Sequence, residues 1–269
     1  MNKAPAFFIS HGAPTFALEP GVLGPRLFAL GQQLSGLPAV LVVSPHWQTR
    51  DLRVMTTAVP ATVHDFGGFP AALYELQYPA AGHPTYAKEA ARLLADAGFT
   101  AGFDGQRGLD HGAWVPLRHL LPSADVPVFQ VSMPVTLNAA DAVRLGRALA
   151  PLRERGVLIV ASGSLTHNLH EFRQSGASEA AYAREFVGWV REAVLANEVD
   201  RLVAYRQSAP HAERAHPTEE HYLPLLVALG ARAGDEAAQV IEGGITHGVL
   251  SMESYAWGLT DARTGTINQ

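Results

Sequence analysis

In this 269-residue chain the question of metal or acid–base chemistry is asked first of imidazole, because the sequence holds 12 histidines and no cysteine. His11, His46 and His167 each follow a short apolar run within a few residues, His167 over a Gly turn. Ligands of open α/β sheets bind just beyond the carboxyl ends of the strands, so three such runs would bring three imidazoles to one edge. A single histidine at the end of a strand is usually a core or capping residue. The stability of a sheet gives no reason for three histidines at such positions. A histidine cluster without cysteine suits Zn²⁺ or non-haem Fe²⁺.

A fourth candidate, His221, lies in a segment that reads as the start of a helix. Thr218 predicts an N-cap, and Glu219 and Glu220 are expected to interact with the helix dipole in the first turn rather than to bind metal. A cation is disfavoured at a helix N-terminus, so a neutral or metal-bound imidazole is the expected state of His221.

Two more histidines lie in glycine-flanked loops. His111 follows Asp110 and precedes Gly112, and His64 precedes Asp65 and a Gly-Gly pair that is flanked by two phenylalanines. His170 follows His167 by three residues. The remaining five histidines lack such a context, and most of them are expected to be solvated at the surface: His83, His119, His211, His216 and His247.

The elements that must position these histidines alternate along the chain. Buried strands are predicted at Ala6–Ile9, Ala39–Val43, Val126–Met133 and Gly156–Ala161. Amphipathic helices are predicted over Pro84–Ala97, from the N-cap Asn138 with a stripe of Leu145, Leu149 and Leu152, and from Ser178 with a stripe that includes Phe186 and Trp189. This order predicts one α/β domain over residues 1–269, with a mostly parallel or mixed central sheet and helices on both faces.

Composition excludes several function classes. A chain that is 48% hydrophobic can bury a large core, and a net charge of −5 argues against a general nucleic-acid binder. The apolar runs are shorter than a signal peptide or a membrane span requires, so we expect a cytoplasmic protein that binds no membrane.

Common catalytic motifs do not occur in the sequence. There is no Gly-x-Gly-x-x-Gly after a strand, no P-loop and no His-Glu-x-x-His helix. Ser162-Gly163-Ser164 does not match the Gly-x-Ser-x-Gly elbow, which argues against a serine hydrolase.

Six motifs, in order from Ala6 to about Met252, resemble the 4,5-DOPA extradiol dioxygenase family of class III ring-cleaving dioxygenases, relatives of the catalytic subunit of protocatechuate 4,5-dioxygenase. They are Ser10-His11-Gly12-Ala13-Pro14, Ser44-Pro45-His46-Trp47, His64-Asp65-Phe66-Gly67-Gly68-Phe69-Pro70, Asp110-His111-Gly112-Ala113-Trp114, Ala161-Ser162-Gly163-Ser164-Leu165-Thr166-His167-Asn168-Leu169 and Pro217-Thr218-Glu219-Glu220-His221-Tyr222-Leu223-Pro224-Leu225.

This resemblance implies a single α/β domain and assigns roles to the histidines. It makes His11, His46 and His221 the ligands of one divalent metal, and His167 a base or a fourth ligand. His111 becomes a second active-site histidine that donates a hydrogen bond or a proton as O₂ reacts. The loop with His64 and Asp65 is expected to border the substrate pocket without a chemical role.

The implied substrates are a DOPA-like catechol and O₂, and the implied product is a ring-opened semialdehyde. The aromatic side chains available to pack the ring are Trp47, Phe66, Phe69 and Tyr222, all of which could equally be core residues. The wider class holds Fe²⁺ with two histidines and a carboxylate, whereas this chain offers three imidazoles. The site charge would then be +2 instead of +1, a ligand set that is also typical of catalytic zinc.

Two alternatives to the dioxygenase stay open at this point. One is a zinc-dependent hydrolase that uses the same histidine cluster. The other is a non-catalytic relative that binds a metal or a ligand.

Overall fold

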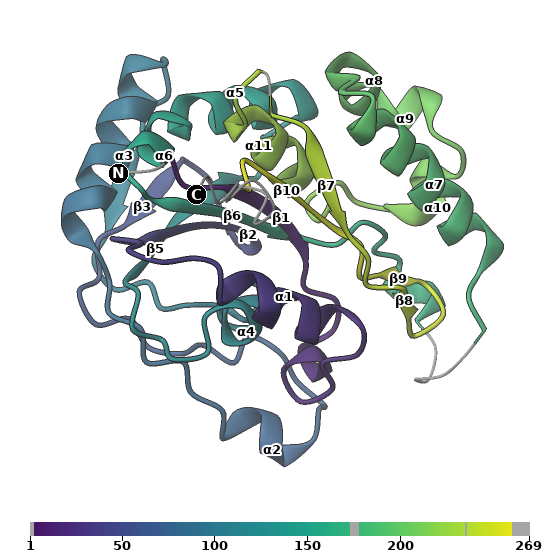
Figure 1. Cartoon of the computed structure of the whole chain (residues 1–269), viewed down its shortest axis with the longest axis horizontal. Helices are drawn as coiled ribbons and strands as arrows, with labels where there is room; N and C mark the ends of the chain where they lie inside the picture. The colour runs from purple at the N-terminus through teal and green to yellow at the C-terminus, as the bar shows by residue number, and fades with distance from the viewer. Residues whose placement is uncertain (1–2, 173–177, 235, 260–269) are drawn as a thin grey trace, which may run out of the picture.

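Four apolar strands form the parallel centre of the sheet. The computed structural model describes residues 3–172, 178–234 and 236–259 (Figure 1). The central strands are β1 (Ala6–Ser10), β6 (Leu158–Gly163), β2 (Val40–Thr49) and β5 (Val128–Pro134). Most of their residues are buried, as expected of strands that are covered on both faces.

Antiparallel strands extend this centre on both sides. β10 (Ser254–Trp257) pairs antiparallel with β1, and β7 (Ala238–Ile241) pairs with β10. On the other side β3 (Arg53–Met55) pairs antiparallel with β5, and β4 (Gly102–Asp104) lies parallel to β3. The order of this eight-stranded sheet is β4-β3-β5-β2-β6-β1-β10-β7, while β8 (Ile245–Thr246) and β9 (Leu250–Ser251) form a separate pair. The α/β class with a mixed sheet is therefore confirmed.

Helices cover both faces of the sheet (Figure 1). α11 (Leu223–Ala231) packs against β6, β1 and α5 (Ala139–Leu149), whereas α4 (His111–Leu120) packs against β2 and α1 (Leu23–Gly31) on the opposite face. The other helices are η1 (Pro14–Ala17), α2 (Ala71–Tyr74), α3 (Pro84–Asp96), α6 (Pro151–Glu154), η2 (Leu169–Glu171), α7 (Ala181–Leu195), α8 (Val199–Val203), α9 (Tyr205–Ser208) and α10 (Ala212–Ala215).

The predicted helices occur with small shifts. α3 spans nearly the predicted range, and the Asn138 side chain accepts a hydrogen bond from the Asp141 N–H, as an N-cap does. The stripe predicted for that helix is divided, because α5 ends at Leu149 and Leu152 belongs to α6. The helix predicted from Ser178 begins at Ala181.

β2 is longer than predicted, and this changes the setting of His46. The strand continues through His46 to Thr49, but its register with β5 shifts between Val43 and Gln48. Pro45 has no N–H to donate to a neighbouring strand, which explains an irregular ladder at this point. His46 therefore lies within an irregular part of the strand, not beyond its end.

Within the part of the chain that the structure describes, no helix combines the length and apolar character needed to cross a membrane.

Candidate metal centre

Three imidazoles converge where β1, β2 and the segment before α11 meet. The Nε2 atom of His46 lies 3.0 Å from Nε2 of His11 and 3.4 Å from Nε2 of His221. One donor nitrogen from each of the three residues lies within 4.8 Å of the other two. The structure thus brings together His11, His46 and His221, the three residues that the resemblance gives as metal ligands.

The strands hold this group in place through backbone hydrogen bonds. The His11 N–H donates to the Gly163 carbonyl at the end of β6, at 2.9 Å. The next residue along, Ser164, donates its N–H to the His221 carbonyl at 3.0 Å. His11 and His221 are thus both attached to the carboxyl end of one central strand.

The outer nitrogen of each ring faces an oxygen. Nδ1 of His11 lies 2.9 Å from the Ser162 hydroxyl, and Nδ1 of His221 lies 3.2 Å from Glu220 Oε1. Nδ1 of His46 lies 3.6 Å from Asp65 Oδ2. An oxygen that accepts at the outer nitrogen favours a proton there and leaves the inward nitrogen free to bind a metal.

This donor set fits a divalent metal. Three inward lone pairs at 3.0–3.4 Å would repel one another without a shared cation or proton. Tetrahedral coordination with metal–nitrogen bonds of about 2.0–2.1 Å places two ligand nitrogens roughly 3.4 Å apart, which agrees with the observed separations.

Burial keeps the three imidazoles neutral. Burial, followed by the neighbouring histidines, holds the pKa values of His11 and His221 well below the usual 6.5. Burial and then His111 lower the pKa of His46 to about 3, against an opposing effect of Asp65. Neutral imidazole is the form that binds metals, so the group is ready to do so at neutral pH.

His167 lies beside this group but does not belong to the same set of donors. Its ring stacks on that of His221. One of its ring nitrogens lies within 4.8 Å of ligand atoms of Glu220 and His221, and His167 is not part of the set formed by His11, His46 and His221. Burial lowers the pKa of His167 to about 4, partly opposed by the Glu220 carboxylate. His167 is thus a neutral imidazole at the edge of the site, able to accept a proton.

His111 lies on the other side of His46. It is the first residue of α4, and its ring centroid lies 3.9 Å from that of His46 and 5.5 Å from that of His11. The Asp65 carboxylate accepts a hydrogen bond from the His111 N–H at 2.9 Å, and Oδ1 also lies 3.0 Å from His111 Nδ1. The second contact is not aligned with the ring N–H, so its attraction is mainly electrostatic.

Asp65 is a carboxylate at neutral pH. Burial alone would raise its pKa, but hydrogen bonds and charge from His111, with a further contribution from His46, lower it to about 2.

A buried polar network joins α4 to β2. Asp110 caps α4 and also accepts hydrogen bonds from Ser44 Oγ and from Arg107, both at 2.7 Å. Arg107 donates in addition to the His46 carbonyl at 3.1 Å. The network holds the backbone of His46 and the start of the helix that carries His111 in one fixed arrangement.

The expectation that Thr218, Glu219 and Glu220 begin a helix is wrong. α11 begins at Leu223, because Pro224 suits its first turn and the preceding residues form turns. Glu219 instead accepts a hydrogen bond from the Tyr205 hydroxyl, and Glu220 lies against His221 and Thr218. Glu220 therefore stands behind a candidate ligand, not at a helix end.

Of the four aromatic residues that were considered for ring packing, two lie near the site. Phe66 lies edge-on to His111 at 5.6 Å between centroids, and Phe69 packs edge-on against Phe66. Tyr222 is a core residue that stacks on Tyr205, and Trp47 is buried beneath the Arg107 guanidinium. The motif histidine of the same loop, His64, contacts the Leu76 carbonyl at 3.0 Å.

The expectation that most of the remaining histidines are solvated at the surface is wrong for His216. It is fully buried, and its Nε2 atom lies 2.9 Å from the Leu165 carbonyl. Of the other four, His211 is exposed, while His83, His119 and His247 are half-buried.

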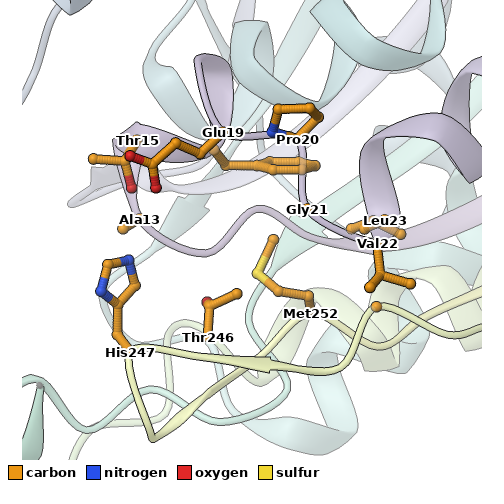
Figure 2. Close-up of a pocket in the computed structure, with 12 residues that line it drawn as sticks. Ala13, Thr15, Glu19, Pro20, Gly21, Val22, Leu23, Thr246, His247 and Met252 are labelled. Carbon is orange, nitrogen blue, oxygen red and sulfur yellow. The ribbon is translucent and has the colours of Figure 1, made fainter. Parts of the chain in front are cut away.

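A small pocket opens beside the residues that follow His11 (Figure 2). Thr15 and Glu19 lie on one side of it, and His247 and Met252 lie on the other. Its volume of about 40 Å³ is far below the ~300–1,000 Å³ of typical ligand pockets, so we do not assign a substrate to it.

Sequence reasoning missed the residues that orient the ligands. Ser162 was considered only as a nucleophile, and Asp65 only as part of a border loop, whereas each faces a histidine that is a candidate ligand. A usable signal was that Asp65, like Asp110 and Glu220, directly adjoins a motif histidine.

Comparison with known proteins gives a consistent result. Residues 30–256 match the family model described as the catalytic LigB subunit of aromatic ring-opening dioxygenase. This range contains His46, His111, His167 and His221, and it begins after His11.

Individual relatives match almost the whole chain. The 4,5-DOPA dioxygenase extradiol of Beta vulgaris is 38% identical over 258 residues, 94% of this chain and 96% of that protein. The protein of the same name from Escherichia coli K12 is 39% identical and covers 94% of each chain. A crystal structure of an uncharacterized E. coli K12 protein superimposes with a TM-score of 0.80 at 34% identity, over 95% of this chain and all of that one.

Proposed function

Because this chain belongs to the family of catalytic LigB subunits of aromatic ring-opening dioxygenases, and is an extradiol dioxygenase, we propose that it opens the ring of a DOPA-like catechol with O₂. Cleavage next to the diol yields a semialdehyde. Both oxygen atoms of O₂ enter the product, so the reaction needs no external reductant.

In this proposal His11, His46 and His221 hold one divalent metal. Their converging Nε2 atoms and their three outer partners support this role. A redox-active metal such as Fe²⁺ would supply electron transfer between the catecholate and O₂. Zn²⁺ would bind the same donors without redox chemistry.

His167 is the proposed base for a phenolic proton. Its low pKa makes it neutral at physiological pH, and its ring stacks on that of the candidate ligand His221. General base catalysis requires hydrogen-bond reach of the hydroxyl, which a catechol held at the metal would provide.

His111 and the aromatic loop are proposed to form the opposite wall. His111 lies over His46, and Phe66 lies against His111. Phe66 would pack the catechol ring, and His111 would exchange a proton or a hydrogen bond with the reacting oxygen.

The observation that carries the proposal is the convergence of three neutral imidazoles between His167 and His111. The test is to strip the protein of metal, reload it anaerobically with Fe²⁺ and measure O₂ uptake with a panel of catechols. Uptake with growth of a yellow ring-opened product supports the proposal, and the absence of both with every catechol contradicts it.

A zinc-dependent hydrolase is the second candidate, because no carboxylate lies among the three converging donors. Three histidines around one metal also activate water in zinc enzymes. Hydrolysis of an ester or amide by the zinc-loaded protein, without ring opening by the iron-loaded protein, would favour this function.

A further inference from the structure

We propose that Asp65 is a positioning residue that links the candidate ligand His46 to His111, so that one carboxylate orients both rings. This inference rests on the proposed function only for the part that His111 plays in turnover. The role toward His46 concerns metal binding, which can be measured without any reaction.

The contacts of Asp65 carry the proposal. One of its oxygens, Oδ2, faces Nδ1 of His46 at 3.6 Å, and the other, Oδ1, lies 3.0 Å from Nδ1 of His111. Both contacts that the Asp65 carboxylate makes with basic side chains among the described residues are thus with imidazoles of the site. The side chain is 23% exposed, so water screens these contacts only in part.

The loop that carries Asp65 is held firmly against the start of α4. The Val63 N–H donates to the Leu109 carbonyl at 2.8 Å, and the Trp114 ring N–H donates to the Val63 carbonyl at 3.0 Å. The His111 N–H then donates to Asp65 itself at 2.9 Å. The carboxylate therefore has a defined position relative to both rings.

A capping role does not account for Asp65. The N-cap of α4 is Asp110, which accepts a hydrogen bond from the Ala113 N–H. Asp65 comes from a distant loop and adds a negative charge near the outer nitrogens of the two histidines. A neutral acceptor would serve the His111 N–H equally well, so the charge adds only to the contacts with the two rings.

The chemical consequence concerns the tautomers. A carboxylate beside Nδ1 favours a proton on that nitrogen and leaves Nε2 unprotonated. For His46 this frees Nε2, the atom that faces His11 and His221. For His111 it likewise leaves Nε2 unprotonated, so that this nitrogen is available to a bound substrate.

The experiment compares Asp65→Asn with Asp96→Asn. The first change keeps an oxygen for the His111 N–H but removes the charge. The control removes the same charge from an exposed ion pair between Asp96 and Arg92. Zn²⁺ affinity is measured by competition with a chelator, and the tautomers of the metal-free protein are read from ¹⁵N shifts of the histidine rings. Thermal unfolding checks that both variants are folded.

We expect Asp65→Asn to weaken Zn²⁺ binding by about 10–100-fold and to shift His46 and His111 toward the Nε2–H form. Asp65→Glu, which keeps the carboxylate, should recover part of the affinity. Unchanged affinity and unchanged tautomers in folded Asp65→Asn, matching Asp96→Asn, would overturn the proposal.

Measurements of turnover separate the role of Asp65 toward His111 from its role toward His46. In the iron-loaded enzyme at saturating metal, Asp65→Asn should lower kcat more than it changes KM, and it should have no further effect on kcat in a His111→Ala background. An equal loss in both backgrounds would overturn the link to His111. If the wild-type protein opens no catechol while Asp65→Asn still weakens Zn²⁺ binding, the proposed reaction fails and the link to His46 stands.

Discussion

The imidazole rings of His167 and His221 lie parallel, with centroids 3.4 Å apart and planes that differ by 8°. The Nε2 lone pair with which His221 would hold a metal lies in the plane of the His221 ring. The lone pairs of His167 point along a parallel plane, displaced by the stacking distance. This arrangement favours His167 as a base over His167 as a fourth ligand.

His167→Ala should therefore lose turnover and keep its metal. Loss of a general base typically costs about 10²–10⁴-fold, and we expect kcat to fall within this range. The measurements are kcat in the iron-loaded variant and the metal content per chain. Loss of the metal would show that His167 is a ligand after all, and wild-type turnover would exclude both roles.

His11→Ala and His221→Ala should each remove the metal. Each change deletes one of three converging donors that have their own outer partners, and the remaining two nitrogens form an incomplete site. Elemental analysis after dialysis should find one metal per chain in the wild type and little in either variant. His211→Ala, at an exposed position paired with Glu185, serves as the control and should keep the full content.

Glu220→Gln should weaken metal binding without emptying the site. The Glu220 carboxylate lies 3.2 Å from the outer nitrogen of His221, and loss of such a partner costs about 10–100-fold in metal affinity. Glu219→Gln is a matched control one residue away, because Glu219 contacts Tyr205 and Arg206 instead of a ligand. Chelator competition measures both variants, and equal affinities would contradict the role of Glu220.

Several features of the site could be predicted from the sequence because they depend on local pattern. Buried parallel strands end at one edge of a sheet, so the histidines that follow β1 and β6 could be expected at the same edge. His221 and His111 were candidates from their own segments, and the resemblance between motifs placed them in the same site, which no periodicity would have done. The mixed sheet and the helices on both faces likewise followed from the alternation of apolar runs.

The outer partners could not be predicted, because they depend on how distant segments pack. Asp65 reaches His111 only after its loop docks on α4, and Glu220 faces His221 because α11 begins later than the Thr218 pattern suggested. His216 was expected in water, but chain folding places it under Leu165 and beside Tyr222. Side-chain direction in such turns is set by tertiary contacts, which a linear motif does not encode.

The buried His216 should make stability depend on pH. Burial lowers its pKa to about 3, whereas an unfolded histidine titrates near ~6.5. Between these values the unfolded chain binds a proton that the folded chain does not, so stability falls as the pH falls. This residue alone contributes a slope of up to about 1.4 kcal/mol per pH unit.

The test is urea unfolding of metal-free wild type and His216→Gln at pH 8, 6 and 5. Glutamine can still donate to the Leu165 carbonyl but does not titrate, so the variant should lose stability less steeply below pH 6.5. A slope equal to that of the wild type would show that His216 is not the group that couples stability to pH here.

Gly112→Ala should disturb the centre through His46. A methyl group on Gly112 would collide with Ser44 Oγ and lie only 2.9 Å from Cδ2 of His46, in a network that holds both residues. Overpacking of this kind costs about 1–3 kcal/mol of stability, and a displaced His46 should also bind metal less tightly. Gly188→Ala, on α7 with open space around it, is the matched control. Equal unfolding free energies and metal affinities in the two variants would exclude this close contact.

The identity of the bound metal should determine the ring-opening activity. Zn²⁺ generally binds nitrogen donor sites more tightly than Fe²⁺ does, so protein purified in air should carry mostly zinc at its three imidazoles. Zinc has a filled d shell and cannot pass electrons between a catecholate and O₂, which makes the expected zinc form weakly active. The measurement is O₂ consumption with one catechol across a series of metal-stripped, zinc-loaded and iron-loaded protein, with metal content determined in each sample. The iron form should be the fastest, although its site lacks the carboxylate ligand of the wider class and its higher positive charge opposes electron donation to O₂. Equal rates for the zinc and iron forms would refute the redox argument.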